Sequence, residues 1–144
     1  MCLFIIFMRI TKVTIIREHI RPQENINDLL LLLGQSLGLF SLRDKDKSCY
    51  RIFIILVKAL KASVELTSDD LAIQTGLSRG TVIHHLNRLM DAGIVTNYKN
   101  KYFIDYSDLT SLVADMRATV NTVFNDIESM ASRIDAALSI KKPK

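Results

Sequence analysis

The chain has 144 residues, long enough for one domain with its own hydrophobic core. Apolar residues make up 49% of it, which excludes a disordered chain. The net charge of +4 and pI near 9.2 fit a polyanionic partner such as nucleic acid. Cys2 and Cys49 are the two cysteines and lie far apart, so we expect a reducing cytoplasm rather than a disulfide framework.

The amino terminus begins with an apolar run, residues 2–7, that fits neither a signal peptide nor a membrane span. No basic residue precedes the run, Arg9 interrupts it, and a span needs roughly 20 apolar residues. We therefore expect no membrane partner. Either Met1 or Met8 is the start of translation. The β-branched residues from Ile10 to Ile16 predict a strand, an arm on a sheet edge or on a partner subunit.

An apolar helix is predicted over residues 25–40, with Asn25 or Asn27 as its N-cap. Gly34 and Gly38 lie four residues apart on it and leave a groove in which another helix can approach closely. This helix and the arm form an amino-terminal segment, residues 1–46.

Leu29–Leu33 in the middle of this helix are more typical of a core than of a ligand-pocket wall. A pocket beneath them, which would make the protein a small-molecule sensor, remains an alternative. The next helix, Cys49–Lys61, is apolar on nearly every side through Ile52–Val57. Such a helix is buried, so we predict that it is the central helix of the domain.

A short helix is predicted next over Ser68–Thr75. Ser68 is its predicted N-cap, and Asp69 and Asp70 occupy the first turn, where the helix dipole favours acidic groups. Gly76 is placed to end the helix in a left-handed turn.

A second short helix follows, capped by Ser78 and ended by Gly93. Its predicted extent is Ser78–Asp91. Two short helices joined by a tight glycine turn are the helix-turn-helix pattern, in which the second helix usually enters the DNA major groove.

The second helix has two distinct faces when its residues are projected at about 100° per residue. The side expected to face the core carries Val82, Ile83, Leu86, Leu89 and Met90. The opposite side carries Gly80, Thr81, His84, Asn87 and Arg88, with His85 at the edge. Arg79 projects nearer the core side, but it lies in the first turn and its long side chain can reach past the helix end. This outward face is small, hydrogen-bonding and cationic, which favours nucleic acid over a merely solvated surface.

Two β-prone runs, Ile94–Tyr98 and Tyr102–Asp105, flank Lys99–Lys101. They predict a short hairpin with a basic tip. A helix-turn-helix followed by a hairpin is a winged helix, whose tip can contact the phosphate backbone.

Residues 77–86 and 89–95 resemble the recognition helix and the start of the wing in winged-helix transcriptional regulators of the arsenic-repressor (ArsR) type. The resemblance covers roughly residues 47–105. It is specific for the winged-helix superfamily, and a MarR-like relative remains open because such proteins share the pattern. The resemblance implies a DNA-binding transcriptional regulator.

Metal sensors of that family carry cysteine pairs in the helix before the recognition helix, or His and Asp on the last helix. Here Ser68–Thr75 has neither Cys nor His, and residues 107–138 have no His. His84 and His85 are adjacent, so a helix points them about 100° apart and they cannot chelate one ion. Phosphate loops and catalytic motifs are also missing from the sequence. We therefore expect no metal, no cofactor and no enzymatic activity.

The last helix is predicted over residues 107–138 and is about 48 Å long at 1.5 Å per residue. A heptad repeat starts at Tyr106 and continues without a slip, which indicates helix–helix association. We expect this helix to pair with its copy and to cover the residue 25–40 helix; an intramolecular core helix alone is the alternative. The expected dimer interface consists of Leu109, Val113, Met116, Val120, Val123, Ile127, Met130 and Ile134.

The sequence thus predicts a mainly α fold with a small β-wing. It comprises an amino-terminal segment (1–46), a winged helix-turn-helix domain (47–105) and a long dimerisation helix with a basic tail (106–144). The predicted function is sequence-specific binding of double-stranded DNA as a homodimeric regulator, with an effector of unknown identity compatible with it. The alternative is a winged helix that binds another protein. The predicted DNA-binding residues are Ser78, Arg79, Gly80, Thr81, His84, His85, Arg88, Lys99, Asn100 and Lys101.

Overall fold

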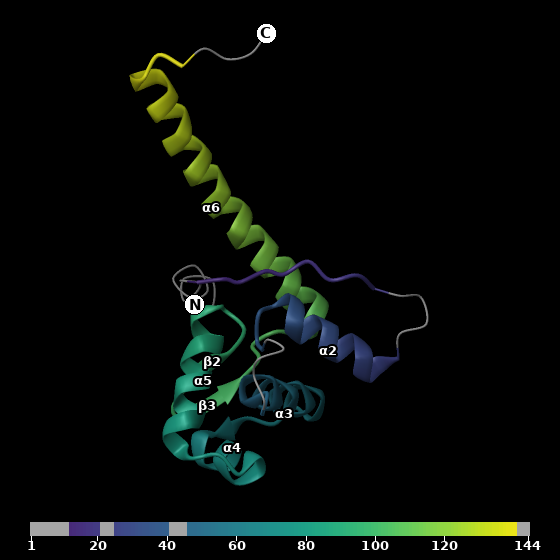
Figure 1. The fold of residues 1–144 in the computed structure, drawn as a ribbon. Helices are drawn as coiled ribbons and strands as arrows, with labels where there is room; N and C mark the ends of the chain where they lie inside the picture. Colours follow the sequence, from purple (N-terminus) through teal and green to yellow (C-terminus); the bar gives the residue numbers. More distant parts are fainter. Residues whose placement is uncertain (1–11, 21–24, 41–45, 141–144) are drawn as a thin grey trace. The chain divides into compact units, whose positions relative to one another are not determined.

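A computed structural model describes residues 12–20, 25–40 and 46–140 of the chain (Figure 1). Its helices are α2 (Ile26–Ser36), α3 (Ser48–Ala62), α4 (Ser68–Thr75), α5 (Arg79–Asp91) and α6 (Leu109–Ala137). The short strands are β1 (Leu66–Thr67), β2 (Thr96–Tyr98) and β3 (Lys101–Phe103). The predicted fold class, mainly helical with a small β-wing and a long last helix, is confirmed. The chain divides into two compact units, residues 1–107 and 108–144.

Helix α3 is the centre of the first unit, as predicted. Its Ile52, Phe53 and Leu56 are fully buried, and the helix contacts α4, α5 and β3. It is not apolar and buried on every side, because Arg51 and Lys58 are exposed. Residues that follow α3 in the chain complete this core and are also fully buried. They are Leu71, Val82, Leu86, Leu89, Ile94 and Val95.

The wing is an antiparallel sheet with strand order β1-β3-β2. Lys101 on the middle strand pairs with Tyr98 on one side and with Thr67 on the other. The hairpin of β2 and β3 confirms the prediction, although each strand is shorter than predicted. Strand β1 was not predicted, because two residues are too few to show an alternating pattern.

The prediction of a strand over residues 10–16 is wrong for residues 12–16, the part of it that the structure describes. Residues 12–20 form no strand and lie as an arm held by two separate backbone hydrogen bonds. The Lys12 amide donates to the Asp91 carbonyl (3.3 Å), and the Ile16 amide donates to the Ser36 carbonyl (2.8 Å). Both acceptors lie at the ends of helices, which offer single carbonyls rather than a strand edge, so no ladder forms. The apolar run 2–7 lies outside the described residues.

Helix α2 is capped by Asn25, whose Oδ1 accepts from the Asp28 amide at 2.9 Å, and Asn27 lies inside the helix. The helix ends at Ser36, four residues earlier than predicted, because the Leu39 amide turns back to the Gly34 carbonyl (2.9 Å).

Gly34 leaves room for the Tyr50 ring of α3. The predicted groove between Gly34 and Gly38 is wrong, because α2 ends at Ser36 and Gly38 packs on Thr14 of the arm instead. A Cβ at Gly34 would lie 2.7 Å from Cδ2 of Tyr50, a residue of α3. The Tyr50 ring cannot withdraw easily, because it also packs against Phe40 with 4.9 Å between the ring centroids. The absence of a side chain at Gly34 is therefore a packing requirement.

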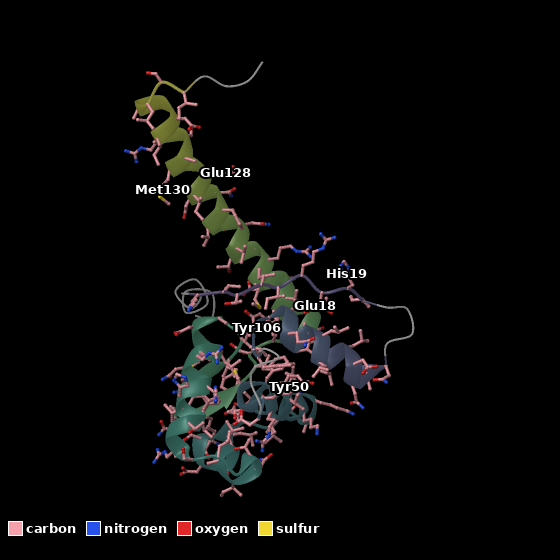
Figure 2. All side chains as sticks on the ribbon, viewed as in Figure 1. Glu18, His19, Tyr50, Tyr106, Glu128 and Met130 are labelled. Atoms are coloured by element: carbon pink, nitrogen blue, oxygen red, sulfur yellow. The ribbon has the colours of Figure 1, made fainter. Side chains whose placement is uncertain are left out.

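Helix α6 begins after Asp108, whose Oδ1 accepts from the Ser111 amide at 2.7 Å. It has 29 residues and is about 44 Å long, slightly less than predicted. Figure 2 shows Glu128 and Met130 on opposite sides of this helix, which is the separation of acidic and apolar residues that the heptad requires.

We predict that Gly34→Ala lowers the free energy of unfolding by about 1–3 kcal/mol, the usual cost of overpacking a core. The better helix propensity of alanine, about 1 kcal/mol, only partly offsets this cost. Gly80→Ala in α5 is the matched control, since nothing lies within 4 Å of the added Cβ. Urea unfolding of both variants checks the prediction. A Gly34→Ala protein as stable as Gly80→Ala would contradict it.

Candidate nucleic-acid interface

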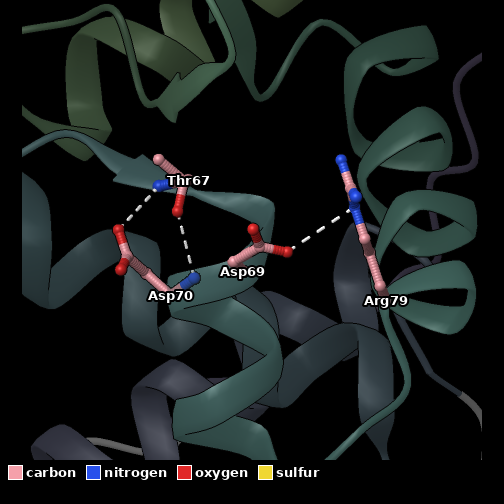
Figure 3. Close-up of polar contacts among 4 residues, drawn as sticks. All are labelled: Thr67, Asp69, Asp70 and Arg79. Atoms are coloured by element: carbon pink, nitrogen blue, oxygen red, sulfur yellow. Dashed lines mark hydrogen bonds and ion pairs between the residues drawn. The ribbon is translucent and has the colours of Figure 1, made fainter.

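The interface begins with the way α4 is anchored to the wing. Thr67, the last residue of β1, is the N-cap of α4 (Figure 3). Its Oγ1 accepts from the Asp70 amide at 3.1 Å, and Asp70 Oδ2 accepts from the Thr67 amide at 3.0 Å. This reciprocal capping box corrects the predicted cap, because Ser68 is the first residue of the helix and is buried.

The capping box changes the acidity of Asp70. Hydrogen bonds from the Thr67 backbone and side chain lower the pKa of the Asp70 carboxyl below its ordinary value, and the nearby positive charge of Lys101 lowers it further. One carboxylate thus joins the end of β1 to the start of α4.

The turn between α4 and α5 has the predicted chemistry. Gly76 has a φ of +72°, and its amide donates to the Ala72 carbonyl at 2.9 Å. Ser78 then caps α5: its Oγ accepts from the Thr81 amide at 3.2 Å and donates to Thr81 Oγ1 at 2.8 Å. The Arg51 guanidinium donates to the Thr75 carbonyl and joins α3 to the end of α4.

The outward face of α5 is accessible along its length. Arg79, Gly80, His84 and Arg88 are exposed, and Thr81 is half-buried. Asn87 is also exposed on this face, where the helical projection placed it. The face therefore presents hydrogen-bonding groups and two guanidinium groups to solvent.

His85 lies apart from this face. Its side chain is half-buried with a buried Nδ1, although its ring centroid is 5.4 Å from that of His84. Hydrogen bonds from the side chain and the backbone of Ser48 lower the pKa of Asp46, and an electrostatic interaction with His85 adds a smaller effect in the same direction. The histidine at the edge of the projection is thus turned inward.

Arg79 has an ion-pair partner, Asp69, that was not predicted from the sequence. Its Nε lies 3.6 Å from Asp69 Oδ1 (Figure 3), and both side chains are about 70% exposed (71% and 70%). The pair joins the first turn of α4 to the first turn of α5. A pair this exposed contributes little to stability, so a phosphate or base can displace Asp69 at low cost.

The wing tip differs in detail from the prediction. Lys99 and Asn100 form the two-residue turn, with φ values of +51° and +63°, and Lys101 is the first residue of β3. The Lys99 ammonium lies 5.3 Å from the centroid of the Tyr98 ring, which is 61% exposed. The tip therefore presents a lysine and an asparagine, beside an aromatic ring that the sequence analysis had not included.

Within residues 12–20, 25–40 and 46–140, no three His, Cys, Asp or Glu side chains gather as metal ligands, and no helix is both long and apolar enough to cross a membrane. Neither of two pockets lined by described residues has Leu29–Leu33 in its wall, beneath which the alternative pocket was expected.

Comparison with known proteins agrees with this geometry. Residues 54–97 match the family model for bacterial regulatory proteins of the arsR family. The match starts within α3, includes α4 and α5, and ends in β2 before the wing tip. The resemblance to ArsR-like winged helix-turn-helix regulators is confirmed, and the match supports DNA-binding transcription regulation. No curated protein and no solved structure matched the chain.

We predict that Asp70 makes the stability of the domain depend on acid pH. A carboxyl with a lowered pKa stabilises the fold above its unfolded value of 3.8, and this contribution is lost as the pH falls through the lower folded value. Urea unfolding between pH 6 and about pH 2 should therefore show a shallower loss of stability for Asp70→Asn than for wild type. Asp126→Asn on exposed α6 controls for the loss of one charge, and equal slopes for wild type and Asp70→Asn would refute the prediction.

Proposed function

We propose that the ArsR-like winged helix-turn-helix domain binds specific double-stranded DNA, with α5 in the major groove and the wing tip on the phosphate backbone. The observation that carries the proposal is the outward face of α5, which is exposed, cationic and free of large apolar side chains. It lies on the helix-turn-helix segment that matches the family model. We assign no catalytic role to the chain, and we propose a cytoplasmic location because a regulator must reach the chromosome.

We assign some side chains on the outward face of α5 to contacts with base edges and others to contacts with phosphates. Thr81 and His84 lie in the amino-terminal half of the helix, the part that usually contacts base edges. Arg79 and Arg88 lie at its two ends and can reach guanine, which arginine binds through two hydrogen bonds. We assign Ser78 to a phosphate, because it lies at the helix N-terminus, where amides and the dipole favour anions. Gly80 leaves room for the backbone to approach the groove.

The wing supplies sequence-independent contacts. Lys99 and Asn100 form its tip, and Lys101 is exposed at the start of β3. We assign all three to the phosphate backbone. His85 is half-buried with a buried Nδ1, so we assign it a supporting role in α5, and its predicted contact with DNA stays a prediction.

We further propose that the protein is a homodimer joined through α6. From Val123 onward the apolar seam is open: Val123 and Ile127 are each 48% exposed, and Met130 and Ile134 are each 56% exposed. The earlier seam residues differ, because Met116 is buried and Leu109, Val113 and Val120 are half-buried in the single chain. A second copy of the same seam would cover the open part, with the acidic side facing solvent. The buried earlier positions would then add less to the interface.

An alternative proposal, a winged helix that binds another protein, has one observation in its favour. Ile73 on α4 is 82% exposed, which is unusual for an isoleucine beside a polar DNA-binding face. A single exposed apolar residue is common on protein surfaces, so the DNA-binding proposal is preferred.

Salt titrations of duplex binding test the DNA-binding proposal. Arg88→Ala should cost about 1–3 kcal/mol on a specific site and relax the base preference at the outer end of each half-site. Lys101→Ala should weaken all duplexes alike and reduce the salt slope by roughly one unit. Lys58→Ala on the exposed side of α3 controls for the loss of one positive charge. The protein-binding alternative replaces this proposal if the wild-type protein does not bind duplex DNA at low salt. It also replaces it if neither variant differs from Lys58→Ala in its affinity for duplex DNA.

Sedimentation tests the homodimer. Ile127→Glu should produce monomers, because an unpaired charge in an apolar seam costs several kcal/mol. Glu128→Gln, at the neighbouring position on the opposite side from Met130, should leave the dimer intact. A wild-type monomer at tens of micromolar would exclude α6 as a dimerisation helix.

A further inference from the structure

A pocket of about 270 Å³ lies where the amino-terminal arm crosses the ends of two helices. Its lining comes from the arm, the end of α2 and the residues after it, the start of α3 and the last turn of α5. The described lining residues are Lys12, Thr14, Leu37, Gly38, Leu39, Cys49, Arg88, Asp91 and Ala92. The pocket therefore includes Arg88, a residue of the DNA-facing side of α5.

The arm is held against the helices that form the rest of the pocket. The backbone amides of Lys12 and Ile16 hold it through hydrogen bonds. In addition, Thr14 packs closely on Gly38: a Cβ added to Gly38 would lie 2.7 Å from side-chain atoms of Thr14. The pocket wall formed by the arm thus has a defined position relative to α2 and α5.

The charges that line the pocket are of both signs. Lys12 and Arg88 supply two cations, and Asp91 supplies a carboxylate. Among the described residues, neither Lys12 nor Arg88 forms an ion pair with Asp91. The carboxyl ends of α2 and α5 also meet here, and helix carboxyl ends favour a positive group. A ligand that carries both a carboxylate and an ammonium would find a partner for each.

The remaining wall is apolar. Leu37, Leu39 and Ala92 line it, and Leu39 is 5% exposed. Pockets for drug-sized ligands start at about 300 Å³, so this pocket suits a smaller molecule.

We propose that this pocket binds a free amino acid with an apolar side chain. The carboxylate would contact Lys12 and Arg88, the ammonium would contact Asp91, and the side chain would lie on Leu37 and Leu39. The regulatory consequence rests on the proposed DNA-binding function: Arg88 cannot hold the ligand carboxylate and contact DNA at the same time. The ligand therefore weakens duplex binding, and duplex DNA weakens ligand binding by the same factor.

Titration calorimetry without DNA tests the site itself. The probes are L-leucine, L-valine, L-methionine and L-phenylalanine, together with 4-methylpentanoate and 3-methylbutylamine, which lack the ammonium and the carboxylate of leucine. At least one amino acid should bind with one site per chain, and 4-methylpentanoate and 3-methylbutylamine should each bind at least about tenfold more weakly than that amino acid. No binding by any of the four amino acids would overturn the proposal.

Variants locate the site. Lys12→Gln and Asp91→Asn keep the backbone groups that hold the arm. Each substitution should weaken the binding of the amino acid about tenfold or more. Lys58→Gln on α3 should leave its affinity unchanged. Circular dichroism confirms that each variant is folded. Binding that neither pocket variant weakens would place the ligand elsewhere and overturn the proposal.

Duplex binding with and without saturating amino acid tests the coupling. Wild-type affinity should fall about fivefold or more, and Arg88→Ala should lose this response. An unchanged wild-type affinity would overturn the coupling. Because calorimetry uses no DNA, a failure of the DNA-binding proposal would be seen separately from a failure of the site.

Discussion

The burial of α3 is the constraint on which the first unit depends. Ile52, Phe53 and Leu56 have no exposed surface, and α4, α5 and β3 all contact this helix. Val82, Leu86 and Leu89 of α5 are also fully buried. On a helix with about 3.6 residues per turn, burial of these three positions leaves His84 and Arg88 facing outward. The orientation of the candidate DNA-reading face is therefore a consequence of core packing. No contact made by the outward-facing side chains is needed to fix it.

Local hydrogen bonds then fix where each element of the interface begins and ends. The Thr67–Asp70 capping box joins β1 to α4, and Ser78 caps α5. Both caps use side-chain oxygens to satisfy amides that the first helical turn leaves without partners. These caps cost no core space, so the short helix α4 can lie between a strand and a tight turn. The Asp69–Arg79 pair adds a weak contact across the same turn.

The charged groups of the chain are arranged so that the two proposed ligands meet at one residue. Arg88 is exposed on the outward face of α5 and also lines the pocket beneath the arm. If both proposals hold, regulation needs no large conformational change, because the two ligands would compete for one guanidinium group. The proposed dimer contact lies elsewhere, on the apolar seam of α6, whose exposure begins at Val123.

The sequence alone determined the features that depend on near neighbours in the chain. The glycine turn at Gly76, the Ser78 cap, the two faces of α5 and the two-stranded wing follow from hydrogen bonds and periodicity within a few residues. Other features were decided by contacts between distant segments: the Thr67 cap in place of Ser68, the third strand β1, the inward His85 and the early end of α2. The arm shows this most clearly, because its β-branched residues are equally suited to a strand. Only the position of two helix ends, each offering a single carbonyl, determined that it lies against them and closes a pocket.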